Sequence, residues 1–296
     1  MGCPEPARSA KPSLMLVDIH SHYFRYPDHF SEDFRMQSRR ARRDVEVDLT
    51  VRWADYHATG RSCDRTVVFG GKARLSGLWV PDREVAAYMA AQPDRLVGFL
   101  SLDPTQPGWR DELEEGHRDL GLRGIKLMPM YAGFRPDDPA FDDLWHYAGR
   151  HGLPVLLHTG TTFIDKAPLE CTLPRRIDNV AIRFPEVRII MAHLSHPYEG
   201  ECVVTIRKHP HVYADISALH YRPFQFYHSL MLVQEYGVWD KLLFGTDYPF
   251  TTVDASIAGL RSLNNMLAGT NLPRLDEACI EEMIGRDSLS LLGIAG

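Results

Sequence analysis

The sequence predicts an α/β protein folded as a (β/α)8 barrel, or TIM barrel, with insertions after strands 1 and 5 and a C-terminal helical segment. Short β-branched runs that end in polar or glycine residues alternate with longer amphipathic stretches, which is the pattern of alternating parallel strands and helices. Eight such units follow one another without an internal repeat. That number favours a closed barrel over an open sheet.

The strands and most of the helices between them can be placed on the chain. Strands are expected at Leu14–His20, Thr66–Phe69, Leu96–Leu100, Gly124–Met128, Val155–His158, Val187–His193, Val212–Ile216 and Leu242–Gly245. Helices are expected at Asp82–Ala91, Pro107–Leu120, Ala140–His151, Ile177–Phe184, Glu199–Lys208 and Phe226–Tyr236. Gly121 and Gly152 each follow one of these helices, at the position where a left-handed residue commonly ends a helix.

The length of the chain indicates one domain with two long loops. With 296 residues, 44% of them hydrophobic, the chain can bury one large core, so we expect a single domain over residues 1–296 whose residues 1–13 form a flexible tail. The stretches Tyr23–Asp48 and Thr161–Arg175 are longer than a minimal unit needs. Both follow predicted strands on the face that carries a barrel's active site, so we expect them to act as substrate loops or lids.

The charge and hydropathy of the chain argue against nucleic-acid and membrane partners. The net charge is -6, and lysine and arginine are scattered among acidic residues, which argues against a nucleic-acid partner. The N-terminus lacks the apolar segment of a signal peptide, and no stretch approaches the roughly 18 apolar residues of a membrane helix. We therefore expect a cytoplasmic protein that acts on a small-molecule substrate, with no membrane partner.

A pair of histidines ends the first predicted strand. His20 and His22 lie two residues apart, and because side chains alternate along a strand, both should point into the barrel. This spacing can hold a metal ion between two imidazoles. Taken alone, two polar residues at a strand end are an equally good reading.

Three further ionisable residues follow predicted strands. His158 follows strand five, His193 follows strand six and Asp247 follows strand eight. The carboxyl ends of barrel strands converge on one face, so these side chains should meet His20 and His22 there. Imidazole and carboxylate ligands with an open position are typical of a zinc-type catalytic centre.

These motifs together resemble the amidohydrolase superfamily. The resemblance is carried by His20-Ser21-His22, by His158, by Ala192-His193 and by the run from Gly245 to Phe250. Within the superfamily, that last run and Gly124-Ile125-Lys126-Leu127 resemble the branch of aminocarboxymuconate-semialdehyde decarboxylase, which includes aromatic-acid decarboxylases, hydratases and lactone hydrolases. The resemblance extends from Leu16 to the C-terminal helix.

The resemblance implies roles for individual residues. His20, His22, His158 and Asp247 would bind one divalent metal ion, most often Zn2+ and sometimes Mn2+. Asp247 and His193 would be catalytic, Asp247 by moving a proton and His193 by stabilising an oxyanion or acting as a base. The sequence departs from many relatives after His193, where Leu194-Ser195-His196-Pro197 replaces small glycines. This departure leaves the substrate open.

Lys126 has three possible roles. Some members of the superfamily carry a carboxylated lysine after strand four that bridges two metal ions, whereas the branch resembled here usually has one ion. An inward-pointing lysine can also bind a carboxylated substrate by charge attraction. A structural ion pair is the third possibility.

Three functions are compatible with these residues. We favour a metal-dependent hydrolase in which metal-activated water attacks an ester, lactone or amide of a small substrate. The alternative is a metal-dependent non-oxidative decarboxylase of an aromatic or unsaturated carboxylic acid, and a further alternative is a catalytically inactive metal-binding barrel. Relatives with long loops often pair through them, so a homodimer is also a prediction.

Overall fold

The fold is the predicted (β/α)8 barrel. The computed structural model describes residues 15–60 and 62–294, so the predicted tail at residues 1–13 lies outside the described residues. The strands are β1 (Val17–His22), β2 (Arg65–Phe69), β3 (Lys72–Ala73), β4 (Leu78–Trp79), β5 (Leu96–Gly98), β6 (Leu100–Leu102), β7 (Ile125–Leu127), β8 (Val155–Leu157), β9 (Ile189–Met191), β10 (Val212–Asp215) and β11 (Leu242–Leu243).

The parallel strands form two sheets that join into one ring. One sheet has the order β1-β2-β5 and the other the order β11-β10-β9-β8-β7-β6. Only Phe99 separates β5 from β6, so the two form one continuous barrel strand that pairs with β2 on one side and β7 on the other. The last seam lies between β1 and the segment after β11, where Ile19 N donates to Phe244 O (3.0 Å) and His22 N donates to Tyr248 O (2.8 Å).

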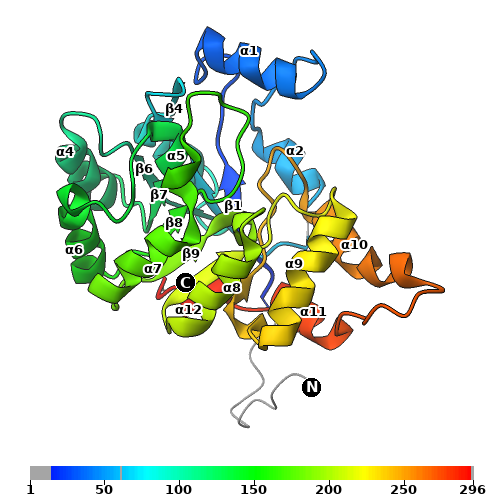
Figure 1. The fold of residues 1–296 in the computed structure, drawn as a ribbon. Coiled ribbons are helices and arrows are strands. Elements are labelled where there is room, and N and C mark those ends of the chain that lie inside the picture. Colours follow the sequence, from blue (N-terminus) through cyan, green and yellow to red (C-terminus); the bar gives the residue numbers. More distant parts are fainter. Residues whose placement is uncertain (1–14, 61, 295–296) are drawn as a thin grey trace.

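Helices cover the outside of this ring and its two ends (Figure 1). They are α1 (Glu32–Ala41), α2 (Trp53–Ala58), α3 (Asp82–Ala90), α4 (Trp109–Glu114), α5 (Pro129–Ala132), α6 (Asp142–His151), α7 (Pro174–Arg183), α8 (Glu199–Lys208), α9 (Pro223–Tyr236), α10 (Val253–Ser262), α11 (Glu277–Ile284) and α12 (Ser288–Leu291). The predicted left-handed residues occur where expected, since φ is 68° at Gly121 and 65° at Gly152. The helix predicted at Pro107–Leu120 is α4 followed by a wider π-helical turn at Glu115–Asp119.

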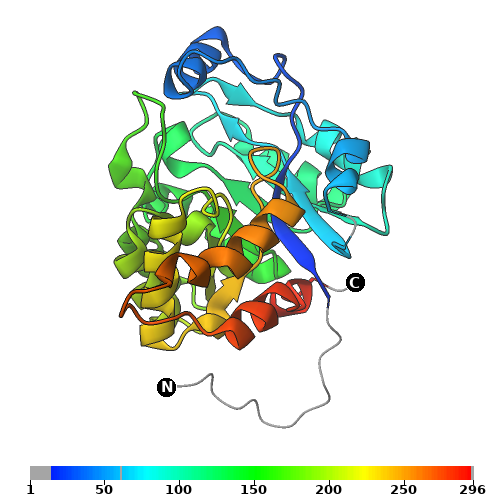
Figure 2. The same ribbon diagram turned by 90° about the vertical axis from the view of Figure 1, so that its right-hand side faces the viewer.

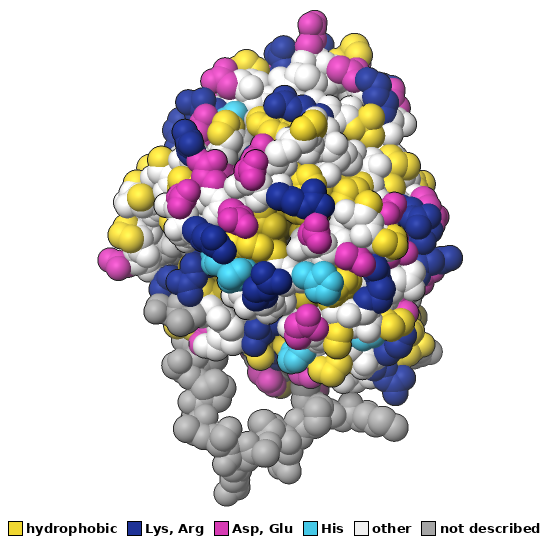
Figure 3. Space-filling model, turned by 90° about the vertical axis from the view of Figure 1, so that its left-hand side faces the viewer, with side chains coloured by type: hydrophobic (Ala, Val, Ile, Leu, Met, Phe, Trp, Pro, Cys, Tyr) yellow, Lys and Arg dark blue, Asp and Glu magenta, His cyan; other side chains and the backbone are white. Residues whose placement is uncertain are grey.

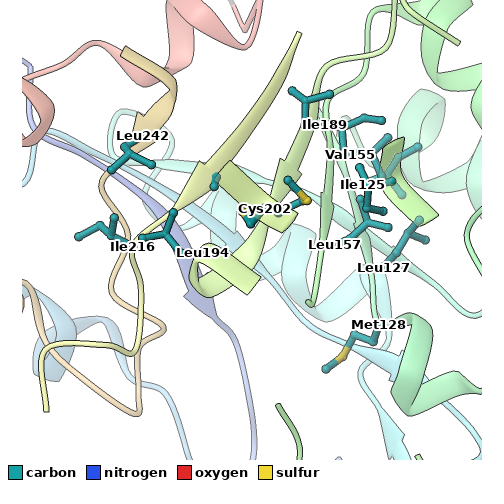
Figure 4. Close-up of a cluster of buried hydrophobic side chains, with 14 of the residues drawn as sticks. Ile125, Leu127, Met128, Val155, Leu157, Ile189, Leu194, Cys202, Ile216 and Leu242 are labelled. Carbon is teal, nitrogen blue, oxygen red and sulfur yellow. The ribbon is translucent and has the colours of Figure 1, made fainter. Parts of the chain in front are cut away.

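Alternation along the strands divides the core into two layers. Ile125, Val155 and Ile189 are register partners on β7, β8 and β9, and their side chains gather with Cys202 of α8 between the sheet and the helices (Figure 4). The next residues of β8 and β9, Leu156 and Ile190, belong instead to the inner cluster. A position on one of these strands therefore decides whether a side chain faces the helices or the barrel interior.

The two ends of the barrel are covered differently. Leu289 of α12 and Leu292, directly after this helix, pack with the inner cluster, which includes Val17 at the start of β1. Figures 1 and 2 place these C-terminal helices and α1 at opposite ends of the molecule. The predicted insertion Tyr23–Asp48 contains α1, which thus lies over the carboxyl ends of the strands.

The outer surface carries charges of both signs. On the face drawn in Figure 3, basic and acidic side chains are interspersed. Across the described parts of the chain, no helix has both the length and the apolar character that a membrane crossing requires.

Candidate metal centre and active-site cavity

The two histidines of β1 point into the barrel, as predicted. The register of β1 against β2 shifts between Asp18 and Ser21. Asp18, ahead of this irregularity, faces α2, where it accepts a hydrogen bond from Tyr56 OH (2.9 Å). His20 lies within this irregularity and His22 beyond it, and their rings contact the inward ring of Phe69 at centroid distances of 5.1 and 4.8 Å.

The hydrogen bonds of His20 and His22 select the tautomer of each ring in its neutral form. His20 Nδ1 lies 2.8 Å from Asp215 Oδ2, and His22 Nδ1 lies 3.2 Å from the carbonyl oxygen of Gly70. Both partners are acceptors, so each Nδ1 donates and each Nε2 is left with a lone pair. Those Nε2 atoms lie 3.3 and 3.2 Å from the same oxygen, Asp247 Oδ1.

This convergence of lone pairs fits a divalent cation. Burial lowers the pKa of His22 to about 4, so that its ring is neutral. Burial and Lys126 lower the pKa of His20, but Asp215 and Asp247 raise it more, and the net pKa is raised. A positive charge is therefore favoured between the two rings and the carboxylate, and a metal ion supplies it with ligands of the usual kind.

Asp247 is held against β1 by its backbone. Its φ of 64° is unusual for a residue other than glycine, and its amide donates to His20 O (2.7 Å). The preceding Thr246 is tied to the first strand, since both its backbone N and its Oγ1 donate to Asp18 (3.0 and 2.7 Å). Burial would raise the pKa of Asp247, but His20 and His22 lower it well below 3.8, which keeps the carboxylate ionised.

His193, predicted only as a catalytic residue, lies close enough to this cluster to be a metal ligand as well. One potential ligand atom from each of His20, His193 and Asp247 lies within 4.8 Å of the other two. The backbone N of His193 donates to Asp215 Oδ1 (3.0 Å), and its Nδ1 lies 3.1 Å from Ser217 O. His193 is therefore a candidate ligand as well as a candidate catalytic residue.

His158 lies beside the cluster rather than within its tightest group. Its Nε2 is 3.0 Å from Thr161 O, and its ring packs edge-on against Tyr131 and His193 at centroid distances of 4.9 and 5.2 Å. Burial, and then the nearby His193, lower its pKa well below 6.5. A neutral ring suits a metal ligand, but the hydrogen bond leaves only Nδ1 available for that role.

Lys126 is buried inside the barrel beneath these residues. Its Nζ lies 3.4 Å from His20 Nε2 and 4.5 Å from the centroid of the Phe69 ring. Burial lowers its pKa to about 8 despite the opposing effect of Asp215 and Asp247. Among the described residues it forms no ion pair within 4.0 Å. This lysine contacts a candidate metal ligand, and its side chain does not line the cavity described below.

Two buried aspartates that support the site were missed in the sequence. Asp215 Oδ1 accepts from the backbone N atoms of His193 and Ser217, both at 3.0 Å, and Oδ2 accepts from His20. Asp18 joins β1 to Thr246, as described above. Both lie within predicted strands, and an acidic residue inside a buried strand was the available signal, because such a group is rarely buried without hydrogen-bonding partners.

A cavity of about 600 Å³ opens above the cluster. His22, His158, His193 and Asp247 line its floor, and both insertions line its walls. Most of the wall is apolar or aromatic, including Phe24, Phe30, Phe34, Leu49, Leu78, Met128, Tyr131, Phe163, Leu219 and Phe250. Of the lysines and arginines in the described chain, only Arg42 and Arg222 line this cavity, and no ion pair joins either of them to a described carboxylate.

The barrel carries, at the carboxyl ends of its strands, a histidine–aspartate cluster whose ligand atoms could hold a metal ion. The family model described as "Amidohydrolase" matches residues 17–282. The chain therefore belongs to the amidohydrolase family, which confirms the resemblance seen in the sequence. No functionally curated protein matches the sequence.

Solved structures with low sequence identity share the fold. An uncharacterized TIM-barrel protein from Bordetella bronchiseptica is 20% identical with a TM-score of 0.67, covering 95% of this chain and 99% of its own. A probable 2-pyrone-4,6-dicarboxylic acid hydrolase from Acinetobacter baumannii, with citric acid bound, is 16% identical at 0.62, with coverages of 94% and 99%. A dihydroxybenzoic acid decarboxylase from Polaromonas sp. JS666, with manganese and 2-nitroresorcinol bound, is 16% identical at 0.61, with coverages of 95% and 97%.

Proposed function

We propose that this protein is a metal-dependent non-oxidative decarboxylase of a small aromatic or otherwise planar carboxylic acid. The observation that carries the proposal is the cavity, whose aromatic and aliphatic walls lead down to Asp247 and the histidines. A planar apolar ligand fits such walls. An apolar setting also favours loss of CO2, because the localised charge of a carboxylate is poorly solvated there.

The two arginines support an acidic substrate. Arg42 and Arg222 line the cavity, and Arg42 lies over the Phe250 ring at 5.2 Å. Guanidinium groups without carboxylate partners attract an anionic substrate into an otherwise apolar space. This shifts our preference from hydrolysis, which the sequence alone favoured, to decarboxylation.

The metal site in this proposal is centred on β1 and Asp247. His20, His22 and Asp247 hold one divalent ion, Zn2+ or Mn2+, and either His158 or His193 completes the set. When bound, the ion supplies a positive charge that orients and polarises the substrate. Metal content measured by plasma mass spectrometry in His158→Ala and His193→Ala should identify the additional ligand, because only the loss of a ligand should deplete the ion strongly.

Residues of the protein supply the proton that replaces CO2 on the substrate. Decarboxylation breaks the bond between the ring carbon and the carboxyl carbon, releases CO2, and leaves an electron pair on the ring carbon that must take up a proton. Asp247 and His193 line the floor of the cavity and are the groups we assign to carry that proton. Because Asp247 is also assigned to the metal ion, His193 is the better proton donor when His158 completes the ligand set.

Hydrolysis is the second candidate, and one observation favours it. The same two groups, Asp247 and His193, can activate water at the floor of the cavity, and one of the similar structures is described as a probable hydrolase of a pyrone dicarboxylic acid. The ligand set does not separate the two reactions, because both need a divalent ion and a proton carrier.

Product analysis tests the proposal. The metal-loaded protein is incubated with a panel of benzoic acids, unsaturated acids, lactones and esters, before and after chelation, and CO2 release and acid release are measured separately. Chelator-sensitive CO2 release from an aromatic acid is the expected result. Chelator-sensitive acid release from lactones or esters alone would replace decarboxylation by hydrolysis, and turnover that survives complete metal removal would contradict the metal site.

A further inference from the structure

A second histidine–carboxylate pair lies in the wall of the cavity, apart from the cluster at its floor. His196 lines the cavity and its residue is only 9% exposed. Its Nδ1 lies 2.5 Å from Oε1 of Glu199, a residue that is 6% exposed. This is the histidine of the unusual Leu194–Pro197 segment that the proposed metal site and proton carriers do not use.

Glu199 is itself held in place. It is the first residue of α8, and the Oγ of Ser229 on α9 donates to its Oε1 (3.1 Å). Two helices therefore fix the carboxylate, and the carboxylate fixes the imidazole ring. Such support is typical of side chains whose orientation matters for binding.

The other histidines of the cavity are held differently. His22, His158 and His193 each direct one ring nitrogen at a backbone carbonyl oxygen. Of the cavity-lining histidines, His196 is the one whose ring nitrogen meets a carboxylate outside the candidate metal cluster, since the carboxylate beside His22 is that of Asp247. Because Glu199 accepts the proton of Nδ1, the tautomer that carries its proton there presents a lone pair on Nε2, and no described side chain or backbone group forms a hydrogen bond with that atom.

We propose that His196, oriented by Glu199, is a substrate-contacting residue that selects a hydroxyl or amino substituent on the substrate. This deepens the proposed function and rests on it: the substrate becomes an aromatic acid that carries a hydrogen-bond donor. An Nε2 acceptor inside an apolar wall loses its hydration when the cavity fills. A ligand that donates to it restores a hydrogen bond, whereas an isosteric apolar group leaves it unsatisfied.

Matched ligand pairs measure this selection directly. Binding of 2-, 3- and 4-hydroxybenzoate is compared by calorimetry with binding of the corresponding methylbenzoates, using the holoprotein with the metal ion it retains. We expect the wild-type protein to prefer at least one hydroxy isomer over its methyl partner by about ten-fold, the size of one hydrogen bond whose loss leaves an unsatisfied group. Equal affinities for all three pairs would overturn the proposal without any variant.

Substitutions of His196 and Glu199 test whether these two residues cause the preference for hydroxybenzoates. His196→Phe and Glu199→Leu should reduce the preference to about two-fold or less, whereas Glu199→Gln, which keeps an oxygen acceptor for Nδ1, should retain most of it. His211→Phe, at an exposed position, is the matched control, and thermal unfolding checks that each variant folds. A preference that survives His196→Phe would remove this residue from recognition.

The two proposals fail in different ways. Binding of benzoates without any preference for the hydroxy isomers overturns the role of His196 and leaves decarboxylation standing. If the wild-type protein binds none of these acids and releases no CO2 from the aromatic panel, both proposals fall. An equal loss of hydroxy and methyl ligands in His196→Phe would indicate a packing role and would also overturn selection.

Discussion

Asp215→Asn replaces one oxygen of a buried carboxylate and should weaken metal binding while leaving the fold intact. Three donors, the backbone N atoms of His193 and Ser217 and the Ser217 Oγ, point at Oδ1. An asparagine must therefore keep its oxygen there, and its amino group then faces His20 Nδ1. Two donors cannot meet, so His20 has to move its proton to Nε2, where the lone pair for the metal ion would be lost.

The expected loss of metal affinity can be estimated from the change in the hydrogen bond to His20. Replacing a hydrogen-bonding partner of a metal-bound histidine typically costs about 10- to 100-fold in metal affinity, or about 1.4 to 2.8 kcal/mol. Competition with a chromophoric chelator measures it, with thermal unfolding of the metal-free protein as a check on the fold. Asp119→Asn, at an exposed position, is the control. An unchanged affinity in Asp215→Asn would refute the tautomer argument for His20.

Further predictions concern catalysis, packing and pH. Asp247→Asn should lower turnover by about 100-fold or more with an unchanged circular dichroism spectrum, and retained activity would exclude Asp247 as the proton carrier. Leu100→Ala should lower the free energy of unfolding in urea by about 2 to 5 kcal/mol, because Leu100 is fully buried. Burial, and then His151, lower the pKa of His117 below 6.5, so the folded protein binds this proton less well than the unfolded chain and loses stability as the pH falls through 6.5. His117→Gln should therefore show a smaller loss of stability between pH 7 and pH 5, and an identical loss would contradict the assignment.

The alternation of short β-branched runs with longer amphipathic stretches made most of the barrel predictable. All eight expected strands occur, because runs such as Val155–Leu157 are buried on both faces and have few other conformations that satisfy their backbone groups. The boundaries were less accurate, since β1 extends to His22 rather than ending at His20. Its irregularity between Asp18 and Ser21 depends on pairing with β2, which local sequence does not specify.

The site was predictable only as a set of residues at strand ends. His20, His22, His193 and Asp247 meet because parallel strands bring their carboxyl ends together. The sequence did not predict which of these residues are best placed to bind a metal ion, because that depends on hydrogen bonds such as those of His158 with Thr161 and of His20 with Asp215. Single-domain organisation, the homodimer and cytoplasmic location stay predictions.

The cavity walls were beyond the reach of sequence reasoning. Arg42 and Arg222 stand out only once the insertion containing α1 and the segment before α9 are folded over the same space. Lys72, a cation near the end of strand two, instead pairs with Asp82 and Glu112 at 2.8 and 2.7 Å. Which cation faces a ligand depends on loop conformation, and that is set by tertiary contacts.

Three of the proposed metal ligands lie on the first barrel strand and just after the last, and this separation in the sequence determines when during synthesis an ion can bind. His20 and His22 leave the ribosome early, whereas Asp247 is among the last barrel residues to be made. A nascent chain thus carries no complete site, and the ion is acquired by a finished barrel. An ion held by His20, His22 and Asp247 would link the first barrel strand to the last, and because it would bind the folded barrel rather than the unfolded chain, it would add to the free energy of unfolding.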